Sequence, residues 1–422
     1  MGWGASRIKL GGKPNFLEVP PAMPTDQPTL TGAARLDPKA RRRSLTAVIA
    51  CITAVGMGLG VSIPLLALAM ERQGVPSALI GLNTAMPALA TFFVTPFVPY
   101  ILRRMNTLTF VYICLAVSAI AMPIYYLVPN IWFWFPLRFI NGLAITGLFV
   151  VSEFWINDLA DDRHRGKLIG LYGSILSAGF ATGPVLLWLV GTEGFAPFAI
   201  IGILIMAAGV PLAYGRGVAP KVTEKPNHPL VVFLIAAPAA TMAGLVYGAT
   251  ETNIFNMLPI YGVRIGLTEQ TAAFVLSIFG AGNILFQVPI GYLADRINRR
   301  LVLLCCAAVG LAGSLLIPVV AHSMILFVPT LFIFGGVVVG LYTVGLTLLG
   351  ERFKGADLAA ANSAFVIMYS AGALIGPPTA GLAMDLWDPH GLVVAMAVLL
   401  GLYVLIAGWR YLKGPPAKSG LD

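Results

Sequence analysis

The sequence predicts an all-α integral membrane protein with twelve transmembrane helices in two pseudo-symmetric halves of six. Three observations support this prediction. First, 58% of the 422 residues are hydrophobic and only 11% are charged, whereas soluble domains carry about 25% charged residues. Second, twelve apolar stretches are each long enough for a span of about 20 residues. Third, the sequence contains an internal repeat.

The twelve candidate spans are continuous apolar runs, which favour helices over the short alternating strands of a membrane β-barrel. They cover roughly residues 45–70, 79–101, 106–127, 131–156, 166–190, 195–214, 230–260, 270–293, 300–320, 324–349, 358–384 and 391–411.

The internal repeat places a glycine and proline frame of the first half onto a second copy 193 residues later. The aligned residues are Gly142, Gly147, Gly179, Gly183 and Pro184 in one copy and Gly335, Gly340, Gly372, Gly376 and Pro377 in the other. An acid also repeats, because Asp158 aligns with Glu351. A duplicated membrane chain of this size is typical of secondary transporters, in which the substrate path lies between the halves.

Polar segments set the expected domain boundaries. Residues 215–229 carry three prolines and mixed charge, which predicts a linker between the halves at 44–214 and 230–412. Residues 1–43 are rich in Pro, Gly, Thr and charge and predict a disordered tail. Residues 413–422 form a second short tail.

The basic residues predict the topology. Most of the 27 Lys and Arg residues fall on the tails and on the loops of one side, whereas Arg72 and Arg264 fall on the other side and Arg138 lies inside a span. The positive-inside rule then places both termini in the cytosol, and the Arg41–Arg43 run is expected to anchor the first span at the anionic leaflet. The net charge of +9 therefore reports topology, and its dispersal over separate loops argues against a nucleic-acid partner.

Two motifs resemble those of the major facilitator superfamily. GYLADRINRR, Gly291–Arg300, resembles the family's G-x-x-x-D-R/K-x-G-x-R-R loop, with Asn298 at the second glycine. RFINGLAITG in the fourth span resembles the family's R-x-x-Q-G motif through Arg138, Asn141 and Gly142.

The fifth span adds a pattern that resembles the superfamily's antiporter motif. Its residues are Gly170, Gly179, Gly183 and Pro184, and the eleventh span carries Gly372, Gly376 and Pro377. Two interpretations stay open. Small residues let helices pack closely and the proline allows a bend, or, as the resemblance implies, the motif excludes proton leak in an antiporter.

The resemblance covers residues 45–411 and implies the major facilitator fold in the lipid bilayer of a bacterial inner membrane. It implies a monomer that moves a small-molecule substrate without a cofactor, with H+ as the coupling ion and efflux slightly favoured. A proton-coupled importer and a non-transporting receptor or assembly protein stay open. No G-x-x-x-x-G-K-[ST] motif supports ATP-driven transport, and the chain shows no clustered residues with catalytic or metal-ligand spacing, so no enzyme is expected.

Charges at the cytosolic ends of the spans predict two symmetry-related clusters. The first combines Asp158 with Arg103 and Arg104, and the second combines Glu351 and Asp295 with Arg296, Arg299 and Arg300. The resemblance implies that such clusters latch a cytosolic gate. Alternatively they are solvated topology charges, each pair contributing less than about 1 kcal/mol.

Three ionisable residues lie inside predicted spans, where a charge costs roughly 3 kcal/mol or more. Glu251 lies in the polar stretch YGATETNIFN, which predicts an unwound segment lining a cavity. It is the first candidate for proton coupling or substrate contact; the alternative is an acid at the outer interface.

Arg138 and Glu153 share the fourth span. Arg138 is expected to hold an anionic group or to modulate a proton site, or else to be a structural arginine that snorkels. Glu153 lies 15 residues later, about 22 Å along a helix, so the two cannot pair. Glu153 is a candidate for binding the substrate or a proton. Alternatively, it joins the cluster that latches the cytosolic gate.

Uncharged polar residues inside the spans are candidates to line a central cavity, although each also suits interhelical hydrogen bonding. They are Asn141, Tyr247, Asn253, Asn283, Gln287, Asn362 and Tyr369.

Overall fold

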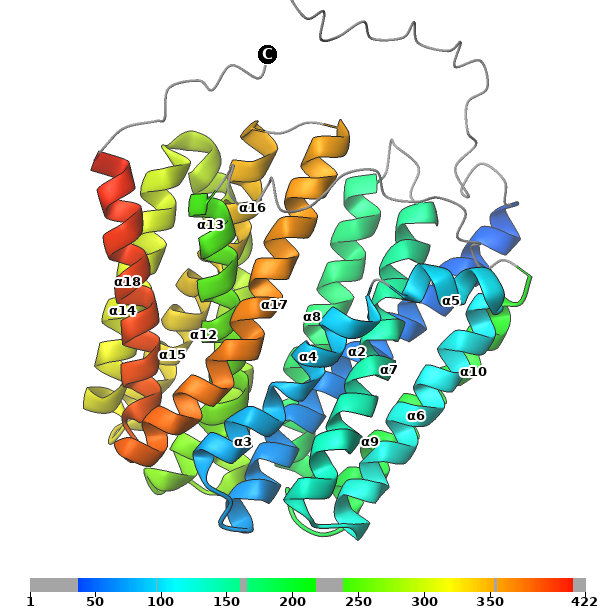
Figure 1. Cartoon of the computed structure of the whole chain (residues 1–422), viewed down its shortest axis with the longest axis horizontal. Helices are drawn as coiled ribbons and strands as arrows, with labels where there is room; N and C mark the ends of the chain where they lie inside the picture. The colour runs from blue at the N-terminus through cyan, green and yellow to red at the C-terminus, as the bar shows by residue number, and fades with distance from the viewer. Residues whose placement is uncertain (1–36, 96, 160–164, 218–237, 353–354, 413–422) are drawn as a thin grey trace, which may run out of the picture.

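The computed structural model describes residues 37–95, 97–159, 165–217, 238–352 and 355–412. Every regular element in these ranges is a helix, which confirms the predicted all-α class. The helices form two adjacent groups, one from each half of the chain, coloured blue to green and green to red in Figure 1.

The first half contains six units of membrane-spanning length, two of them broken. Its helices are α2 (Pro38–Arg72), α3 (Ser77–Thr84), α4 (Met86–Val94), α5 (Val98–Arg104), α6 (Thr107–Leu127), α7 (Ile131–Leu159), α8 (Arg165–Val190), α9 (Ala196–Ala207), α10 (Gly209–Leu212) and the 3₁₀ turn η1 (Ala213–Gly215). The second unit breaks after Thr84 because Pro87, in the first turn of α4, has no N–H to continue the ladder.

The second half also contains six units. Its helices are α12 (Pro238–Arg264), α13 (Glu269–Arg296), α14 (Arg299–Val320), α15 (Met324–Val338), α16 (Gly340–Arg352), α17 (Gly355–Leu386) and α18 (Gly391–Leu412). Among the described residues, 11 helical stretches are long and apolar enough to cross a membrane, and α12 is not one of them. With 27 residues α12 is long enough, but its middle is polar. Counted with α12, the described helices form the predicted twelve units.

The helices define two ends of the bundle. Helix α2 begins and α18 ends at the same end, the top of Figure 1, which we call the terminal end. Helices α2 and α12 finish at the opposite end, which we call the far end.

The two halves use their glycines in the same way. In the first half, a Cβ on Gly183 of α8 would clash with the backbone of Gly60 of α2. In the second half, a Cβ on Gly376 of α17 would clash with the backbone of Ala249 of α12. These glycines therefore allow two equivalent helix pairs to pack backbone to backbone. A role in excluding proton leak stays a prediction, and the surroundings of Gly170 lie outside the described residues.

The halves contact each other in the far-end portions of their helices. Gly81 of α3 lies against the backbone of Pro377 in α17, and Gly381 of α17 lies against the backbone of Ser77. Helices α8 and α13 also meet, where the Ser277 hydroxyl donates to the Ala181 carbonyl at 3.1 Å. The far end is thus the place where the two halves are joined.

Candidate functional site

Glu251 lies at the centre of a hydrogen-bonded group that links three helices of the second half. The hydroxyl of Tyr247 donates to its Oε1 and the hydroxyl of Tyr369 donates to its Oε2, both at 2.6 Å. The amide of Asn283 donates to the Tyr247 hydroxyl at 2.8 Å. We call these four residues the acid cluster. The sequence named all four as candidates, and the structure brings them together from α12, α13 and α17.

The predicted unwinding around Glu251 is wrong, because α12 is a continuous helix from Pro238 to Arg264. Two of its polar side chains bond to the backbone of their own helix. The hydroxyl of Thr252 donates to the carbonyl of Gly248 at 2.6 Å, and the amide of Asn256 donates to the carbonyl of Thr252 at 2.8 Å. Since such bonds satisfy polar side chains within a helix, the stretch needs no break. Glu251 is therefore presented by a rigid element.

Tyr342 of α16 extends the acid cluster, and sequence reasoning missed it. Its ring centroid lies 5.5 Å from that of Tyr247 and 6.1 Å from that of Tyr369. The carboxylates of Glu251 and Glu153 both act electrostatically on its hydroxyl. Glu153 belongs to α7 of the first half, where its side chain is exposed. No motif distinguishes Tyr342 in the sequence, so only the fold reveals that its hydroxyl is near enough to acids of both halves to interact with them electrostatically.

Arg138 lies in a second polar group, in the first half. Its side chain is 4% exposed and its Nη1 has no hydrogen-bond partner among the described residues. Tyr125 of α6 interacts with it electrostatically and also neighbours Asn141. The hydroxyl of Tyr125 and the Oδ1 of Asn141 are buried, and neither has a hydrogen bond of normal geometry within the described ranges.

We infer from helix register that Asn83 of α3 lies beside this group. Gly142 of α7 lies against Pro87, and one turn earlier on these two helices, both of which begin at the far end, come Arg138 and Asn83. Asn83 is fully buried, and neither polar atom of its amide has a partner in the described part of the chain. We call Asn83, Tyr125, Arg138 and Asn141 the arginine cluster. The sequence named Arg138 and Asn141 but missed the other two, which lie in otherwise apolar spans.

Two other predicted cavity residues, Asn253 and Gln287, form no hydrogen bond with either cluster in the described part of the chain, and a third falls outside the described side chains. Asn253 is fully buried between α12 and α17, with its Oδ1 beside the position of Gly376. Gln287 is exposed on α13, one turn beyond Asn283. The side chain of Asn362 lies outside the described residues.

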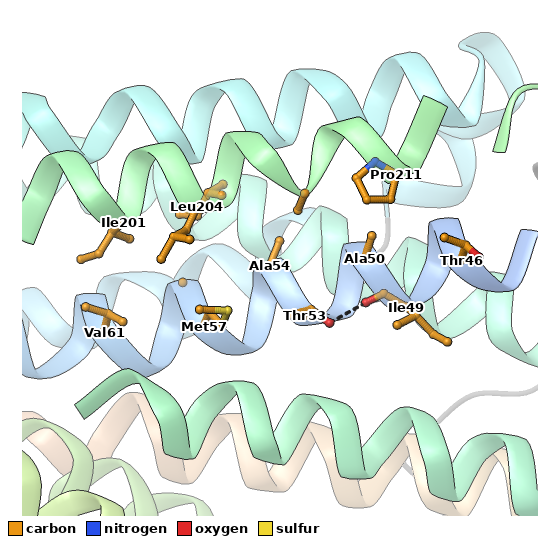
Figure 2. A pocket seen from close by; sticks show the side chains of 13 residues that line it. Thr46, Ile49, Ala50, Thr53, Ala54, Met57, Val61, Ile201, Leu204 and Pro211 are labelled. Carbon is orange, nitrogen blue, oxygen red and sulfur yellow. Dashed lines mark hydrogen bonds between the residues drawn. The ribbon is translucent and has the colours of Figure 1, made fainter. Parts of the chain in front are cut away.

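An apolar groove lies away from both clusters, between α2 and α9 (Figure 2). Its volume is about 430 Å³. Its walls come only from the first half, from Thr46 to Val61 on one side and from Ile201 to Pro211 on the other. It therefore lies apart from the interface between the halves.

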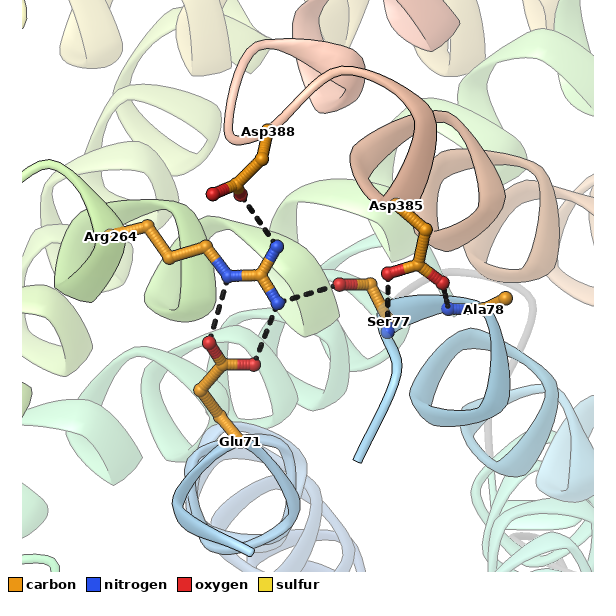
Figure 3. A network of polar contacts seen from close by, with 6 residues as sticks. All are labelled: Glu71, Ser77, Ala78, Arg264, Asp385 and Asp388. Atoms are coloured by element: carbon orange, nitrogen blue, oxygen red, sulfur yellow. Dashed lines mark hydrogen bonds and ion pairs between the residues drawn. The ribbon is translucent and has the colours of Figure 1, made fainter. Parts of the chain in front are cut away.

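Arg264 organises an ionic network at the far end (Figure 3). Its Nε and Nη2 donate to the two carboxylate oxygens of Glu71 at 2.8 and 3.0 Å, and its Nη1 donates to Asp388 at 2.7 Å. Nη2 also donates to the hydroxyl of Ser77 at 2.8 Å. A bidentate arginine–carboxylate pair is both strong and directional, so this side chain joins α12, α2 and the end of α17.

Two further contacts extend this far-end network. The carboxylate of Asp385, at the end of α17, accepts from the backbone N–H groups of Ser77 and Ala78, both at 2.8 Å. It caps the N-terminus of α3 from the other half of the molecule. Arg72 pairs with Glu269 at 3.1 Å. The sequence treated Arg72 and Arg264 only as topology charges; their isolation on a side poor in basic residues was the available signal.

The terminal end shows a different pattern of charges. Asp295 pairs with Arg299, one turn away, at 2.9 Å. The guanidinium of Arg296 lies over the ring of Tyr292 at 4.2 Å, and that of Arg104 lies over Tyr100 at 4.4 Å.

The predicted terminal-end clusters are only partly visible. Arg103 is exposed and Arg300 is half-buried in the first turn of α14. The side chains of Asp158 and Glu351 lie outside the described residues, so both clusters stay a prediction.

A family model described as Major Facilitator Superfamily matches residues 48–241 and 240–422. The chain is 24% identical over 359 residues to the uncharacterized MFS-type transporter YfkF of Bacillus subtilis, covering 84% of this chain and 92% of that protein. It is also 24% identical over 343 residues to the uncharacterized MFS-type transporter YcaD of Escherichia fergusonii, covering 80% and 88%.

Two solved structures share the fold. A bacterial homologue of the human lysosomal transporter Spinster, in an inward-facing and occupied conformation, aligns with a TM-score of 0.72 at 14% identity, covering 90% of this chain and 100% of that one. The nucleoside transporter NupG aligns with a TM-score of 0.68 at 16% identity, covering 86% and 98%.

Proposed function

Because the chain belongs to the Major Facilitator Superfamily, we propose that it moves a small organic solute by alternating access, coupled to protons through Glu251, with efflux slightly favoured. The observation that carries the proposal is the acid cluster, in which a membrane-embedded carboxylate holds α12 and α17 together. Intramembrane acids of this kind are expensive and mark ion or substrate pathways.

A proton on Glu251 would change the bonds of the cluster. A carboxylate accepts at both oxygens, whereas a carboxylic acid must donate through one of them. One of the two tyrosine hydroxyls must then accept from Glu251 instead of donating to it, and both bonds lose the assistance of the negative charge. The bond to Tyr369 links α12 to α17, so protonation would weaken this link between the two helices.

Helix α17 connects protonation of Glu251 to the contacts that join the two halves at the far end. Its residues Gly381 and Asp385 contact the start of α3 in the first half. Since α17 carries both Tyr369 and these contacts, a proton bound at Glu251 can bias the far-end closure. We place the terminal end in the cytosol, on the positive-inside argument, so the conformation described is closed to the outside.

The arginine cluster supplies a second, positively charged contact for the substrate. A buried guanidinium without an ion-pair partner among the described residues is costly unless a charge or hydrogen bond compensates it. A carboxylate or phosphate on the solute would provide both. We therefore propose a solute with an anionic group, bound between Arg138 and the acid cluster.

Two other functions stay open. A proton-coupled importer would use the same residues with the reverse order of proton and solute binding. A receptor on this fold would bind a solute without moving it.

A transport assay separates these functions. The full chain is reconstituted in sealed liposomes with a pH-sensitive dye inside, and a panel of anionic and neutral organic solutes is added outside. We expect one class of anionic solute to move protons. Labelled solute that equilibrates without a proton signal would indicate a uniporter or another coupling ion, and binding without flux would indicate a receptor.

A further inference from the structure

We propose that the groove between α2 and α9 holds one acyl chain of an anionic phospholipid, whose headgroup is bound by Lys39, Arg42 and Arg216 at the terminal end. The proposal is independent of the transported solute, because the groove lies entirely within the first half. It rests on the shape of the groove, its apolar walls and the charges at one of its ends.

The walls of the groove suit a hydrocarbon chain. Eight of its lining residues follow one face of α2, and the facing wall consists of aliphatic residues and Pro211 (Figure 2). The hydroxyls of Thr46 and Thr53 donate to carbonyls one turn earlier on their own helix, at 3.0 and 2.8 Å. These bonds satisfy the only hydroxyls on the wall, which leaves an apolar surface.

The groove is longer than the hydrocarbon depth of one leaflet. Its α2 wall runs from Thr46 to Val61, which is about 22 Å at 1.5 Å per residue. Half of the roughly 30 Å hydrocarbon core is about 15 Å. The groove is therefore long enough to take a single chain from the membrane surface to the bilayer centre.

The terminal end of the groove carries positive charge. Continued by helical spacing from Thr46, the lining face of α2 carries Arg42, Arg43 and Lys39, all exposed. Arg43 bridges to the other wall, because its Nε donates to the carbonyl of Tyr214 at 2.9 Å and its Nη2 to the carbonyl of Arg216 at 3.1 Å.

This bridge fixes where a headgroup would lie. It holds the backbone of Arg216 beside Arg43, so the exposed side chains of Arg42 and Arg216 both belong to this end of the groove. None of the ion pairs in the described residues uses Lys39, Arg42 or Arg216. A phosphate at the mouth of the groove would meet these cations, whereas a zwitterionic headgroup would add a repelled ammonium.

Native mass spectrometry of the purified, delipidated full chain tests this proposal. The probes are phosphatidylglycerol and phosphatidylcholine with identical acyl chains. We expect the wild-type protein to bind phosphatidylglycerol at least fivefold more tightly than phosphatidylcholine at its first site. A wild-type protein without this preference would overturn the proposed headgroup site.

Substitutions at two neighbouring residues separate the groove from the general lipid surface. Ala208 lines the groove, whereas Ala207 is exposed outside it. Ala208→Phe should remove the first phosphatidylglycerol site, and Ala207→Phe should keep it. If Ala208→Phe retains the site while remaining folded, the groove does not hold the chain. Should Ala208→Phe fail to fold, Ala50→Phe fills the groove from the α2 wall and provides the same test.

The headgroup contacts have their own test. Arg42→Gln should lower the preference for phosphatidylglycerol over phosphatidylcholine at least threefold while binding of phosphatidylcholine stays unchanged. If binding of both lipids falls equally, or binding of neither falls, the assignment of Arg42 to the headgroup site is contradicted.

Discussion

Glu251 and Arg138 lie in matching helical scaffolds but in opposite states of hydrogen bonding. The Glu251 carboxylate accepts from two tyrosine hydroxyls at 2.6 Å. The Arg138 guanidinium is buried with Nη1 unpartnered in the described part of the chain, beside an asparagine and a tyrosine whose oxygens also have no acceptable hydrogen bond. The second half therefore holds an acidic residue whose oxygens both accept hydrogen bonds. The first half holds a basic residue with an unpartnered N–H group, counted over the described residues.

The internal repeat sharpens this contrast. At the offset of 193 residues, the acid cluster aligns with Ala54, Gly58, Ala90 and Leu176 of the first half. The arginine cluster aligns with Leu276, Pro318, Leu331 and Phe334 of the second half. Each cluster thus has apolar counterparts in the other half, although the glycines that pack the helices repeat.

The difference separates scaffold from chemistry. Packing glycines must recur wherever the same helix pair recurs, because the close backbone approach leaves no room for a side chain. Polar groups carry no such constraint and need appear only where a proton or a solute is handled. We therefore expect substitutions in the scaffold to have equal effects in the two halves, and substitutions in the clusters to have different effects.

The largest effect is expected from the packing glycines. Gly183→Ala and Gly376→Ala each place a Cβ against a neighbouring backbone that cannot rotate away, so each should destabilise the protein by about 1–3 kcal/mol or more. Thermal unfolding in detergent measures this. Gly173→Ala is the matched control on α8, because open space surrounds that position, and alanine should stabilise the helix there by about 0.5–1 kcal/mol. If only one of Gly183→Ala and Gly376→Ala is strongly destabilising, the two helix pairs are not packed equivalently.

The next effect concerns Arg138. Arg138→Met should raise the KM for the transported anion roughly 10- to 100-fold, since a hydrogen bond to a charged group contributes about 1.5–3 kcal/mol. Its unfolding temperature should stay equal or rise, because an uncompensated buried charge has been removed. Solute uptake and thermal unfolding of the same preparation give both values. A lowered unfolding temperature with unchanged KM would identify Arg138 as a structural arginine.

The far-end network should have an intermediate effect. Arg264→Gln removes the bidentate pair with Glu71 and the contact with Asp388, so the far end should open more often, by up to about fivefold for a network contributing about 1 kcal/mol. The readout is the rate at which a membrane-impermeant maleimide labels Ser277→Cys from the far side, in a Cys305→Ser background.

A double-mutant cycle provides the control for this network. Glu71→Gln should add little once Arg264→Gln is present, because the two changes break one interaction. Fully additive rates would show that the pair does not hold the far end closed.

The smallest effect is expected at the edge of the acid cluster. Asn283→Ala removes the donor to Tyr247, a bond worth about 0.5–1.5 kcal/mol, so proton-coupled flux should fall about threefold. Gln287→Ala, one turn away and exposed, should leave flux unchanged. Equal losses in the two variants would place the cavity along α13 instead of at the cluster.

The sequence predicted the fold because its signals act locally. Apolar length and the spacing of glycines determine where helices lie and which faces pack. The same reasoning identified Tyr247, Asn283 and Tyr369 with Glu251, because polar groups inside a span are rare. It failed for the helicity of α12, where Thr252 and Asn256 bond to their own backbone instead of interrupting it.

Contacts between distant segments were beyond the sequence. Arg264 lies 193 residues from Glu71 in the chain, and the pairing depends on how the halves meet. Tyr342 and Asn83 also belong to clusters only because of helix register. Single polar residues in apolar spans give no indication of their partners until the helices are packed.

The most direct test of the account compares wild-type protein with Glu251→Gln in sealed liposomes, measuring solute-dependent proton movement and, separately, exchange of labelled solute at equal pH. Glu193→Gln, an exposed acid at the far end, is the matched control. We expect Glu251→Gln to abolish proton movement and proton-driven accumulation while solute exchange persists, and Glu193→Gln to behave as wild type. Proton movement of wild-type size in Glu251→Gln would contradict the assignment of Glu251 as the coupling acid.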